Sequence, residues 1–201
     1  MGKPSQIKTI KAVFLDRDGV LNRLVMNPQT GTLESPHRVE DLDIFSWVPE
    51  SLNRLKTAGF HLFLISNQPS YAKGKTTLES IQAIQNSFQQ QMERWNIPFT
   101  KYFYCYHHPN GIVKDLAIRC QCRKPGTLFL EQARDEFHVH LSASWLVGDR
   151  DSDMICGKNA GTKTIFILEG QSGNDSSPSQ ADYSASNLAD AVEIILREVS
   201  K

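Results

Sequence analysis

Two carboxylates directly follow the first apolar segment of the chain. The stretch KAVFLDRDGVLN, residues 11–22, places Asp16 and Asp18 two positions apart after mostly apolar residues. Side chains two apart on an extended backbone point to the same side, so both carboxylates are expected to face one crevice while Arg17 turns away. Gly19 then permits a sharp turn. Taken alone, the stretch is equally compatible with an Asp-Gly turn and a helix-capping acid.

Two further segments place polar side chains in comparable positions. LISNQ brings Ser66 and Asn67 to the end of a second apolar segment, and CRKPG places Arg123 and Lys124 before Pro125. The proline favours an extended backbone at the residue before it. Taken separately, the first piece is more often a turn and the second a solvated surface.

A fourth segment, WLVGDRDSDM, repeats the pattern of the first. An apolar segment ends at Gly148 and delivers Asp149, with Asp151 and Asp153 close behind. These acids could simply cap the helix that follows. Separate turns and caps do not explain the joint order of carboxylates, hydroxyl, cation and carboxylates, all of them at the ends of expected strands or just before a helix.

These groups together suit phosphoryl transfer. The reaction gathers negative charge on three equatorial oxygens, and a carboxylate nucleophile would be repelled by a phosphate unless cations neutralised both. Lys124, the hydroxyl of Ser66 and a magnesium ion could supply that neutralisation, because hard oxygen ligands suit Mg²⁺ better than they suit softer metals.

A second group of residues has the spacing of a zinc site. The pairs C-x-H and C-x-C are separated by twelve residues, and the donors are Cys105, His107, Cys120 and Cys122. On extended backbone each pair turns its donors to one side, so two facing pairs offer Zn²⁺ a tetrahedron of three thiolates and one imidazole. Four protein ligands close the site, which predicts a structural zinc in the loop of about 105–122 and leaves His108 outside it. The alternative is a set of unrelated buried thiols.

The elements that must position these residues alternate between strand and helix patterns. Such alternation predicts an α/β fold of three layers, with a central parallel sheet covered by helices on both faces. In such a sheet the carboxyl ends of the strands open into the ligand crevice. The expected strands are Lys11–Leu15, His61–Ile65, Lys101–Cys105, Ser144–Val147 and Lys163–Leu168. The expected helices cover about 49–58, 76–95, a segment from about 126, a segment after the fourth strand, and 187–199.

Two local details accompany this pattern. Thr76 and Glu79 form a candidate capping box for the second helix. Residues 169–180, rich in Gly, Ser and Pro, are expected to form a surface loop.

The four segments resemble the four motifs of the haloacid dehalogenase-like (HAD) phosphohydrolases, and the resemblance spans about residues 11–168. It implies a Rossmann-like HAD fold without a large cap domain. It also implies that Asp16 is the nucleophile and forms an aspartyl phosphate, and that Asp18 is the general acid and base. Magnesium would be held by the carboxylates of Asp16 and Asp149 and by the backbone carbonyl of Asp18.

The zinc pattern just before the third motif is similar to the HAD group that contains the heptose bisphosphate phosphatases and the histidinol-phosphate phosphatases. The twelve-residue gap and the sequence CQCRKP favour the heptose branch. In that branch the arginine matching Arg123 contributes to substrate recognition and the lysine matching Lys124 steadies the phosphoryl group. Ser66 and Asn67 are assigned to phosphate and substrate binding by the same resemblance, and NQPSYAKGK is similar to the substrate loop of the group.

Some segments depart from the heptose pattern. Residues 23–37 are longer than the corresponding segment and lack its Gly-Tyr-Val-His-like stretch, and ILEGQSG lacks its Arg-Thr-Gly pattern. These departures leave a different phosphorylated sugar possible. A histidinol-phosphate phosphatase, a non-catalytic zinc-stapled binding module and a phosphatase of nucleic-acid ends remain as alternatives.

Composition and charge narrow the class of protein. The 201 residues are 40% hydrophobic and carry 22 basic and 22 acidic side chains, which suits one domain over 1–201 without a basic stripe for nucleic acid. No apolar stretch approaches a bilayer span, and the N-terminus lacks the apolar core of a secretory signal. We therefore expect a cytoplasmic monomer that acts on a small phosphorylated sugar, without a membrane or nucleic-acid partner.

Overall fold

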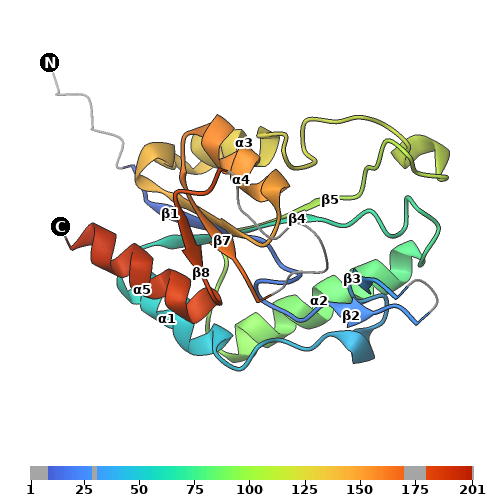
Figure 1. The fold of residues 1–201 in the computed structure, drawn as a ribbon, viewed down its shortest axis with the longest axis horizontal. Helices are drawn as coiled ribbons and strands as arrows, with labels where there is room; N and C mark the ends of the chain where they lie inside the picture. The colour runs from blue at the N-terminus through green and yellow to red at the C-terminus, as the bar shows by residue number, and fades with distance from the viewer. Residues whose placement is uncertain (1–8, 29–30, 170–179, 201) are drawn as a thin grey trace, which may run out of the picture.

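A central parallel sheet organises the chain. The structure, a computed structural model, describes residues 9–28, 31–169 and 180–200. Six strands pair in parallel in the order β5-β4-β1-β6-β7-β8 (Figure 1). Their bounds are β1 Ala12–Leu15, β4 His61–Asn67, β5 Lys101–Cys105, β6 Trp145–Gly148, β7 Lys163–Ile167 and β8 Tyr183–Ala185. From β1 the chain continues to β4 and β5 on one side of β1 and then crosses to β6, β7 and β8 on the other, so β1 lies at the point where the strand order reverses.

Helices cover both faces of this sheet. The α-helices are α1 Val48–Thr57, α2 Leu78–Arg94, α3 Leu128–Phe137, α4 Asp151–Ala160 and α5 Leu188–Val199. Short 3₁₀ helices occur at Val39–Asp41, Lys114–Leu116 and Leu141–Ala143. Helices α1, α2 and α5 lie on one side, and α3 and α4 on the other (Figure 1). The predicted three-layer α/β architecture is confirmed.

The alternation of side chains along each strand divides the core in two. On β1, Val13 and Leu15 join the cluster under α1, α2 and α5, whereas Ala12 and Phe14 join the cluster under α3 and α4. All four side chains are buried because β1 is central and covered on both sides. This explains why the strand is apolar throughout.

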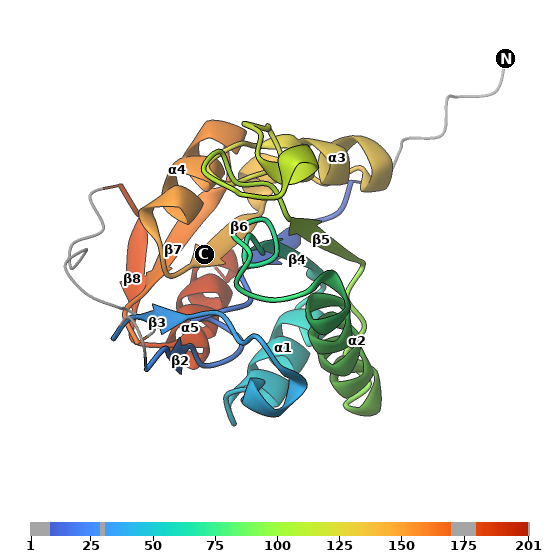
Figure 2. The ribbon, with the colours of Figure 1, turned by 90° about the vertical axis from the view of Figure 1, so that its right-hand side faces the viewer.

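A second, two-stranded sheet lies within the segment that departs from the heptose pattern. Strands β2 (Val25–Met26) and β3 (Leu33–Glu34) pair antiparallel, with Val25 opposite Glu34. Figure 2 shows this hairpin on the same side of the molecule as the loops that follow β4 and β5.

The cap of α2, strand β8 and the loop at 169–180 differ from the expectations or lie outside the described residues. The helix cap is Thr77, whose side chain accepts a hydrogen bond from the backbone N–H of Ser80, so the capping box predicted for Thr76 and Glu79 was wrong by one position. Thr76 instead donates from its hydroxyl to the carbonyl of His37. Strand β8 was not predicted because three residues carry too little pattern. The surface loop expected at 169–180 lies almost entirely outside the described residues.

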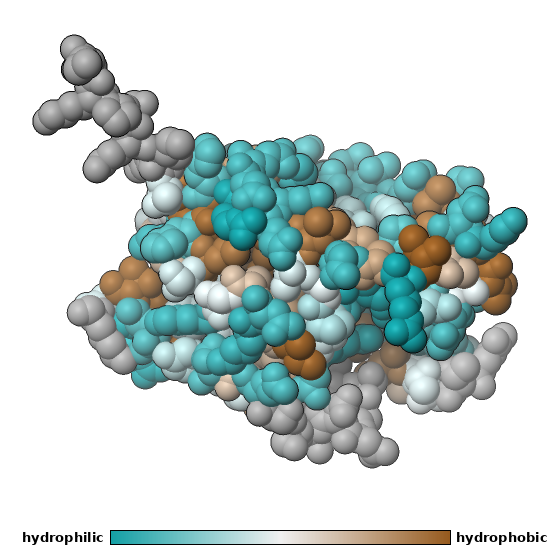
Figure 3. Space-filling view, turned by 90° about the horizontal axis from the view of Figure 1, so that it is seen from above, coloured by the Kyte–Doolittle hydropathy of each residue, from teal (hydrophilic) through white to brown (hydrophobic). Residues whose placement is uncertain are grey.

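The surface above α3 and α4 is largely hydrophilic, with hydrophobic residues in small separate groups (Figure 3). Among the described residues, no helix combines the length and the apolar character needed to cross a bilayer.

The burial of Leu52 and the exposure of Leu168 predict that their alanine variants lose different amounts of stability. Leu52 of α1 is fully buried, so Leu52→Ala should lower the free energy of unfolding by about 2–5 kcal/mol through lost burial and the cavity that remains. Leu168 is 46% exposed, and Leu168→Ala should change it by only about 0.5 kcal/mol. Urea unfolding of both variants measures the difference, and equal losses would contradict this description of the core.

Candidate active site

Three neighbouring strands place polar side chains at the same edge of the sheet. Asp16 follows β1, Asp149 follows β6, and Ser66 lies near the end of β4. The backbone N–H of Asp16 donates to the carbonyl of Val147 at 3.0 Å, which continues the pairing of β1 with β6. All three side chains are buried.

A cavity of about 250 Å³ opens at this edge. The sequence-predicted residues that line it are Asp16, Asp18, Asn67, Arg123 and Lys124. Its other walls come from residues 32–35 of the hairpin, the loop after β4 and the start of α4. Ser66 and Asp149 are buried beside these residues and do not line the cavity.

Lys124 lies between two carboxylates. Its Nζ is 3.0 Å from Asp16 Oδ2 and 2.5 Å from Asp153 Oδ1, and it donates to the carbonyl of Ile65 at 2.9 Å. Burial alone would lower the pKa of Lys124, but the charges of Asp153 and Asp16 outweigh burial and raise it. The lysine is therefore held as a cation at the base of the cavity.

Asp153 is a residue to which the sequence assigned no role beyond a possible helix cap. Its Oδ2 accepts from the backbone N–H of Arg150 at 3.1 Å and so does cap α4, while Oδ1 faces Lys124. Burial raises the pKa of Asp153 to about 6, with the charge of Lys124 opposing the rise. Its position four residues after Asp149, in the first turn of a helix, was the available signal. Asp151 begins α4 and does not line the cavity.

The prediction that Arg17 turns away from the two carboxylates was wrong. Its fully buried side chain donates from Nε to Asp18 Oδ1 at 3.0 Å and from Nη2 to Asp18 Oδ2 at 3.1 Å. The alternation of side chains holds only while the backbone is extended, and three successive N–H groups, those of residues 20–22, donate to the Arg17 carbonyl in a tight turn. The turn includes Gly19, with φ of +86°.

Asp18 is surrounded by hydrogen-bond donors. Gln68 Nε2 donates to Oδ2 at 2.6 Å, and Asn22 Nδ2 donates to Oδ1 at 3.0 Å. Burial would raise the pKa of Asp18, but the charge of Arg17 and these hydrogen bonds outweigh burial and lower it. These neighbours therefore favour the ionised form of Asp18.

Gln68 is a site residue that the sequence did not single out. The same Nε2 also donates to Ser66 Oγ at 2.9 Å, and the side chain is buried. It thus links the hydroxyl at the end of β4 to Asp18. Only its place in LISNQ, one residue beyond Asn67, could have indicated it.

Asn67 and Arg123 occupy the wall near Lys124. The amide of Asn67 accepts from the backbone N–H of Lys124 at 3.1 Å and donates to its carbonyl at 3.2 Å. This pair of hydrogen bonds fixes Lys124 to the end of β4. Arg123 donates from Nη1 to the carbonyl of His107 at 3.4 Å and faces the cavity.

Three carboxylates offer a site for a cation. One oxygen from each of Asp16, Asp149 and Asp153 lies within 4.8 Å of the others. Asp149 Oδ1 is buried and has no hydrogen-bond partner within the described part of the chain. Burial, together with the charges of Asp16 and Asp153, raises the pKa of Asp149 well above its usual value. Arg150 Nε lies 4.0 Å from Asp149 Oδ2, too far for a hydrogen bond. A hard divalent cation fits this set, because it would offset the negative charges of the three carboxylates.

Glycine at position 19 makes room for this arrangement. A Cβ at Gly19 would lie 2.4 Å from Asp149 Oδ2, so a larger residue would displace this carboxylate.

The backbone carbonyl of Asp18 is the third cation ligand expected from the sequence, and that assignment stays a prediction. The side-chain cluster contains Asp153 in addition to Asp16 and Asp149.

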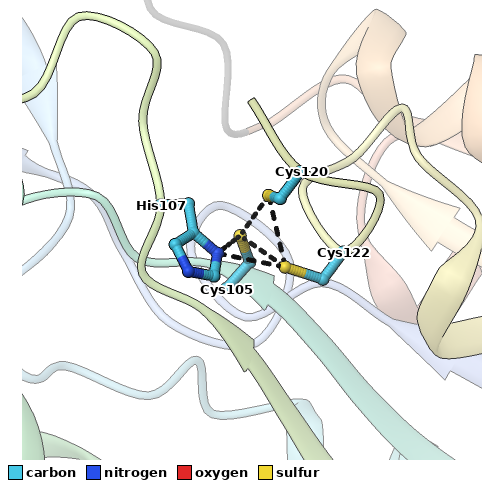
Figure 4. A group of neighbouring side chains, drawn as sticks. All are labelled: Cys105, His107, Cys120 and Cys122. Carbon is cyan, nitrogen blue, oxygen red and sulfur yellow. Dashed lines mark hydrogen bonds between the residues drawn. The ribbon is translucent and has the colours of Figure 1, made fainter. Parts of the chain in front are cut away.

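The four expected zinc donors meet after β5. Figure 4 shows Cys105, His107, Cys120 and Cys122 directed toward one point. Their donor atoms lie 3.3–3.7 Å apart in the pairs that make contact. Zinc bonded to sulfur and nitrogen at its usual lengths would place them roughly 3.5–3.8 Å apart. His108 is turned elsewhere, with its Nδ1 accepting from Asn110. The donor set and its spacing fit Zn²⁺.

The chain is similar in sequence to known phosphatases. The HAD-hydrolase-like family model matches residues 121–191. A D-glycero-alpha-D-manno-heptose-1,7-bisphosphate 7-phosphatase of Photorhabdus laumondii is 32% identical over 164 residues, which cover 82% of this chain and 85% of the relative. A D-glycero-beta-D-manno-heptose-1,7-bisphosphate 7-phosphatase of Escherichia coli K12 is 30% identical over 95% of this chain and 96% of the relative.

A solved structure shares the fold. It is a D,D-heptose 1,7-bisphosphate phosphatase of B. bronchiseptica in complex with magnesium and phosphate. It superposes with a TM-score of 0.74 at 23% identity and covers 94% of this chain and 99% of its own.

The raised pKa of Asp149 predicts a gain of stability when its charge is removed. In metal-free protein at pH 7, Asp149→Asn should unfold at a higher temperature than the wild type, because burial and the nearby carboxylates oppose ionisation of Asp149. The unfolded chain ionises this group above about pH 4, whereas the folded chain resists it, so the wild type is penalised only above that pH. The gain should therefore shrink as the pH is lowered to about 4.

Magnesium provides the control for this variant. Added Mg²⁺ should raise the unfolding temperature of the wild type and leave that of Asp149→Asn unchanged. A variant that is less stable than the metal-free wild type at pH 7 would contradict the electrostatic description.

The cluster of three cysteines and one histidine predicts that replacing Cys120 removes zinc, whereas replacing the distant Cys156 does not. Cys120→Ser should lose zinc and lower the unfolding temperature by several degrees, since metal affinity contributes to folding and each kcal/mol corresponds to about 2–4 °C at this chain length. Cys156→Ser is the matched control and should leave zinc bound, because Cys156 is a buried residue of α4 outside the cluster of zinc donors. Metal analysis and calorimetry measure both, and equal zinc content in the two variants would refute the assignment.

Proposed function

Since the chain belongs to the family of HAD-like D-glycero-D-manno-heptose 1,7-bisphosphate 7-phosphatases and is a phosphatase, we propose that it removes the 7-phosphate of D-glycero-D-manno-heptose 1,7-bisphosphate. The observation that carries this proposal is the placement of Asp16 beside buried Lys124 in a cavity whose wall also holds Arg123 and Arg150. A small cavity lined by both carboxylates and cations suits a compact phosphorylated sugar.

Asp16 is the proposed nucleophile. Its Oδ1 accepts the backbone N–H of Arg17 at 2.7 Å, and its Oδ2 lies 3.0 Å from Lys124 Nζ. These two contacts fix the carboxylate at the cavity wall, where it would take the phosphoryl group as an aspartyl phosphate. Lys124 would steady the phosphate oxygens in the same step.

Mg²⁺ is the proposed catalytic cofactor. Asp16 and Asp149 would hold it, together with the backbone carbonyl of Asp18. When bound, it would neutralise the phosphate oxygens and reduce their repulsion of the Asp16 carboxylate. The related structure from B. bronchiseptica holds magnesium and phosphate.

Asp18 is the proposed general acid and base. Donation of a proton to the leaving oxygen requires the protonated form, whereas the hydrogen bonds from Arg17, Gln68 and Asn22 stabilise the carboxylate. The arrangement in the structure therefore suits the second half of the reaction, in which Asp18 takes a proton from the attacking water. A substrate phosphate near Asp18 would favour the protonated form in the first half, because like charges raise the pKa of an acid.

Zn²⁺ is the proposed structural cofactor. Four protein ligands leave no position open for a hydrolytic water. The last ligand, Cys122, is followed directly by Arg123 and then Lys124. Zinc would therefore fix these two cations at the cavity by holding a loop whose regular structure is limited to the short helix at Lys114–Leu116.

Phosphate release tests the proposed function. The wild type should release one phosphate from each anomer of the heptose bisphosphate that it accepts, and should do so faster than from histidinol phosphate. Asp16→Asn should lower kcat on the order of a thousandfold or more, since the attacking oxygen is replaced, while circular dichroism shows an intact fold.

The matched control is Asp115→Asn, because Asp115 is exposed on the zinc loop outside the cavity. This variant should retain full activity. Faster hydrolysis of histidinol phosphate would replace the heptose proposal by that alternative. Absence of any phosphate release would favour the non-catalytic alternative.

A further inference from the structure

The side chain of Arg17 is buried beside the cavity without reaching it. It is 0% exposed and does not line the cavity, whereas the next residue, Asp18, does. Within the described part of the chain, Asp18 is the one carboxylate whose oxygens lie within 4.0 Å of the guanidinium nitrogens. Any effect of this side chain on the reaction must therefore pass through Asp18.

The guanidinium of Arg17 holds both oxygens of the Asp18 carboxylate. Nε donates to Oδ1 at 3.0 Å, and Nη2 donates to Oδ2 at 3.1 Å. Asn22 contacts Oδ1 alone, at 3.0 Å, and Gln68 contacts Oδ2 alone, at 2.6 Å. A planar guanidinium that engages two oxygens fixes the plane of the carboxylate, which single contacts from amides do not.

Two tyrosines near Arg17 carry no opposite charge. The charge of Arg17 lowers the pKa of Tyr104 and of Tyr106, but burial outweighs this effect and raises both pKa values. Both hydroxyls are therefore neutral near pH 7, and that of Tyr106 donates to Gln85 Oε1 at 2.8 Å. Among these neighbours, Asp18 alone balances the charge of Arg17.

Fold stability does not by itself account for an arginine at this position. Nη1 of Arg17 is buried and has no hydrogen-bond partner within the described part of the chain. An unpaired buried donor costs free energy, and apolar side chains of similar volume often replace a buried ion pair without loss of stability. The arginine is therefore better explained by its effect on Asp18.

From this geometry we propose that Arg17 is a positioning residue for the reaction: it holds the Asp18 carboxylate in the plane from which Asp18 exchanges protons with the leaving oxygen and with water. In the first half of the reaction a proton passes from the carboxyl group of Asp18 to the leaving oxygen, and in the second half the attacking water returns one. Arg17 keeps its own protons throughout. The inference rests on the proposed role of Asp18 and not on the identity of the sugar.

Replacement of Arg17 tests this role through the split between kcat and KM. Arg17→Met should lower kcat by about tenfold to a hundredfold, because general acid–base catalysis contributes about 10²–10⁴ and Asp18 is still present but no longer held in one plane. KM and the Mg²⁺ concentration that gives half-maximal activity should stay within about twofold, because Arg17 does not line the cavity. Arg17→Lys keeps the charge without the two-point contact, so its kcat should be intermediate. If circular dichroism shows that Arg17→Met does not fold, Arg17→Lys provides the same test.

A second background separates positioning from a structural role. Asp18→Asn removes the group that transfers the proton, so adding Arg17→Met to it should change kcat by less than about twofold. A residue that only stabilised the fold would lower kcat by the same factor in both backgrounds.

Arg54→Met is the matched control, because Arg54 pairs with Glu193 between α1 and α5 and does not line the cavity. It should leave kcat unchanged. An unchanged kcat in Arg17→Met, or equal losses in the two backgrounds, would overturn the role of Arg17 while the phosphatase activity stands. The assay uses the heptose bisphosphate or, where the wild type prefers another phosphate ester, that ester. Failure of the heptose assignment is therefore seen in the wild type, and failure of this inference in the Arg17 variants.

Discussion

The buried ammonium group of Lys124 holds the site together. Taking a charge out of water is costly unless it is paired, and Lys124 is paired on two sides, with Asp16 after β1 and with Asp153 on α4. Three separate parts of the chain therefore have to meet for this lysine to be buried. Asp149 has a weaker partner, with Arg150 Nε 4.0 Å from its Oδ2, and a divalent cation would offset the charge of the three neighbouring carboxylates.

Short loops give the cavity its shape. The β2–β3 hairpin forms one wall and is tied to the loop after β4 by the ion pair of Glu34 with Lys75. The zinc loop packs on the opposite side of that loop through Ile112 and Val113. A zinc site and a two-stranded sheet can thus order segments that are too short to bury a core of their own.

Much of this arrangement could be predicted from the sequence. Apolar segments with helical patterns between them predicted five of the strands, and residues at the carboxyl ends of parallel strands share one edge. That rule predicted Asp16, Asp18 and Asn67 at this edge, and the expected position of Arg123 and Lys124 before a helix added the cations; all five line one cavity. The spacing of the cysteines predicted their cluster equally well, because two pairs on extended backbone have few ways to face each other. The monomeric state and the cytoplasmic location stay predictions.

The sequence by itself determined the sheet, the edge where the functional groups gather and the zinc donors, because each follows from local periodicity or fixed spacing. Only the tertiary structure decided that Arg17 faces Asp18, that Asp153 pairs with Lys124 and that Gln68 connects Ser66 to Asp18. These contacts depend on where the backbone leaves the extended conformation and on which side chains from distant segments meet. A buried charge takes the nearest opposite charge that packing allows, and a pattern along the chain does not record that choice.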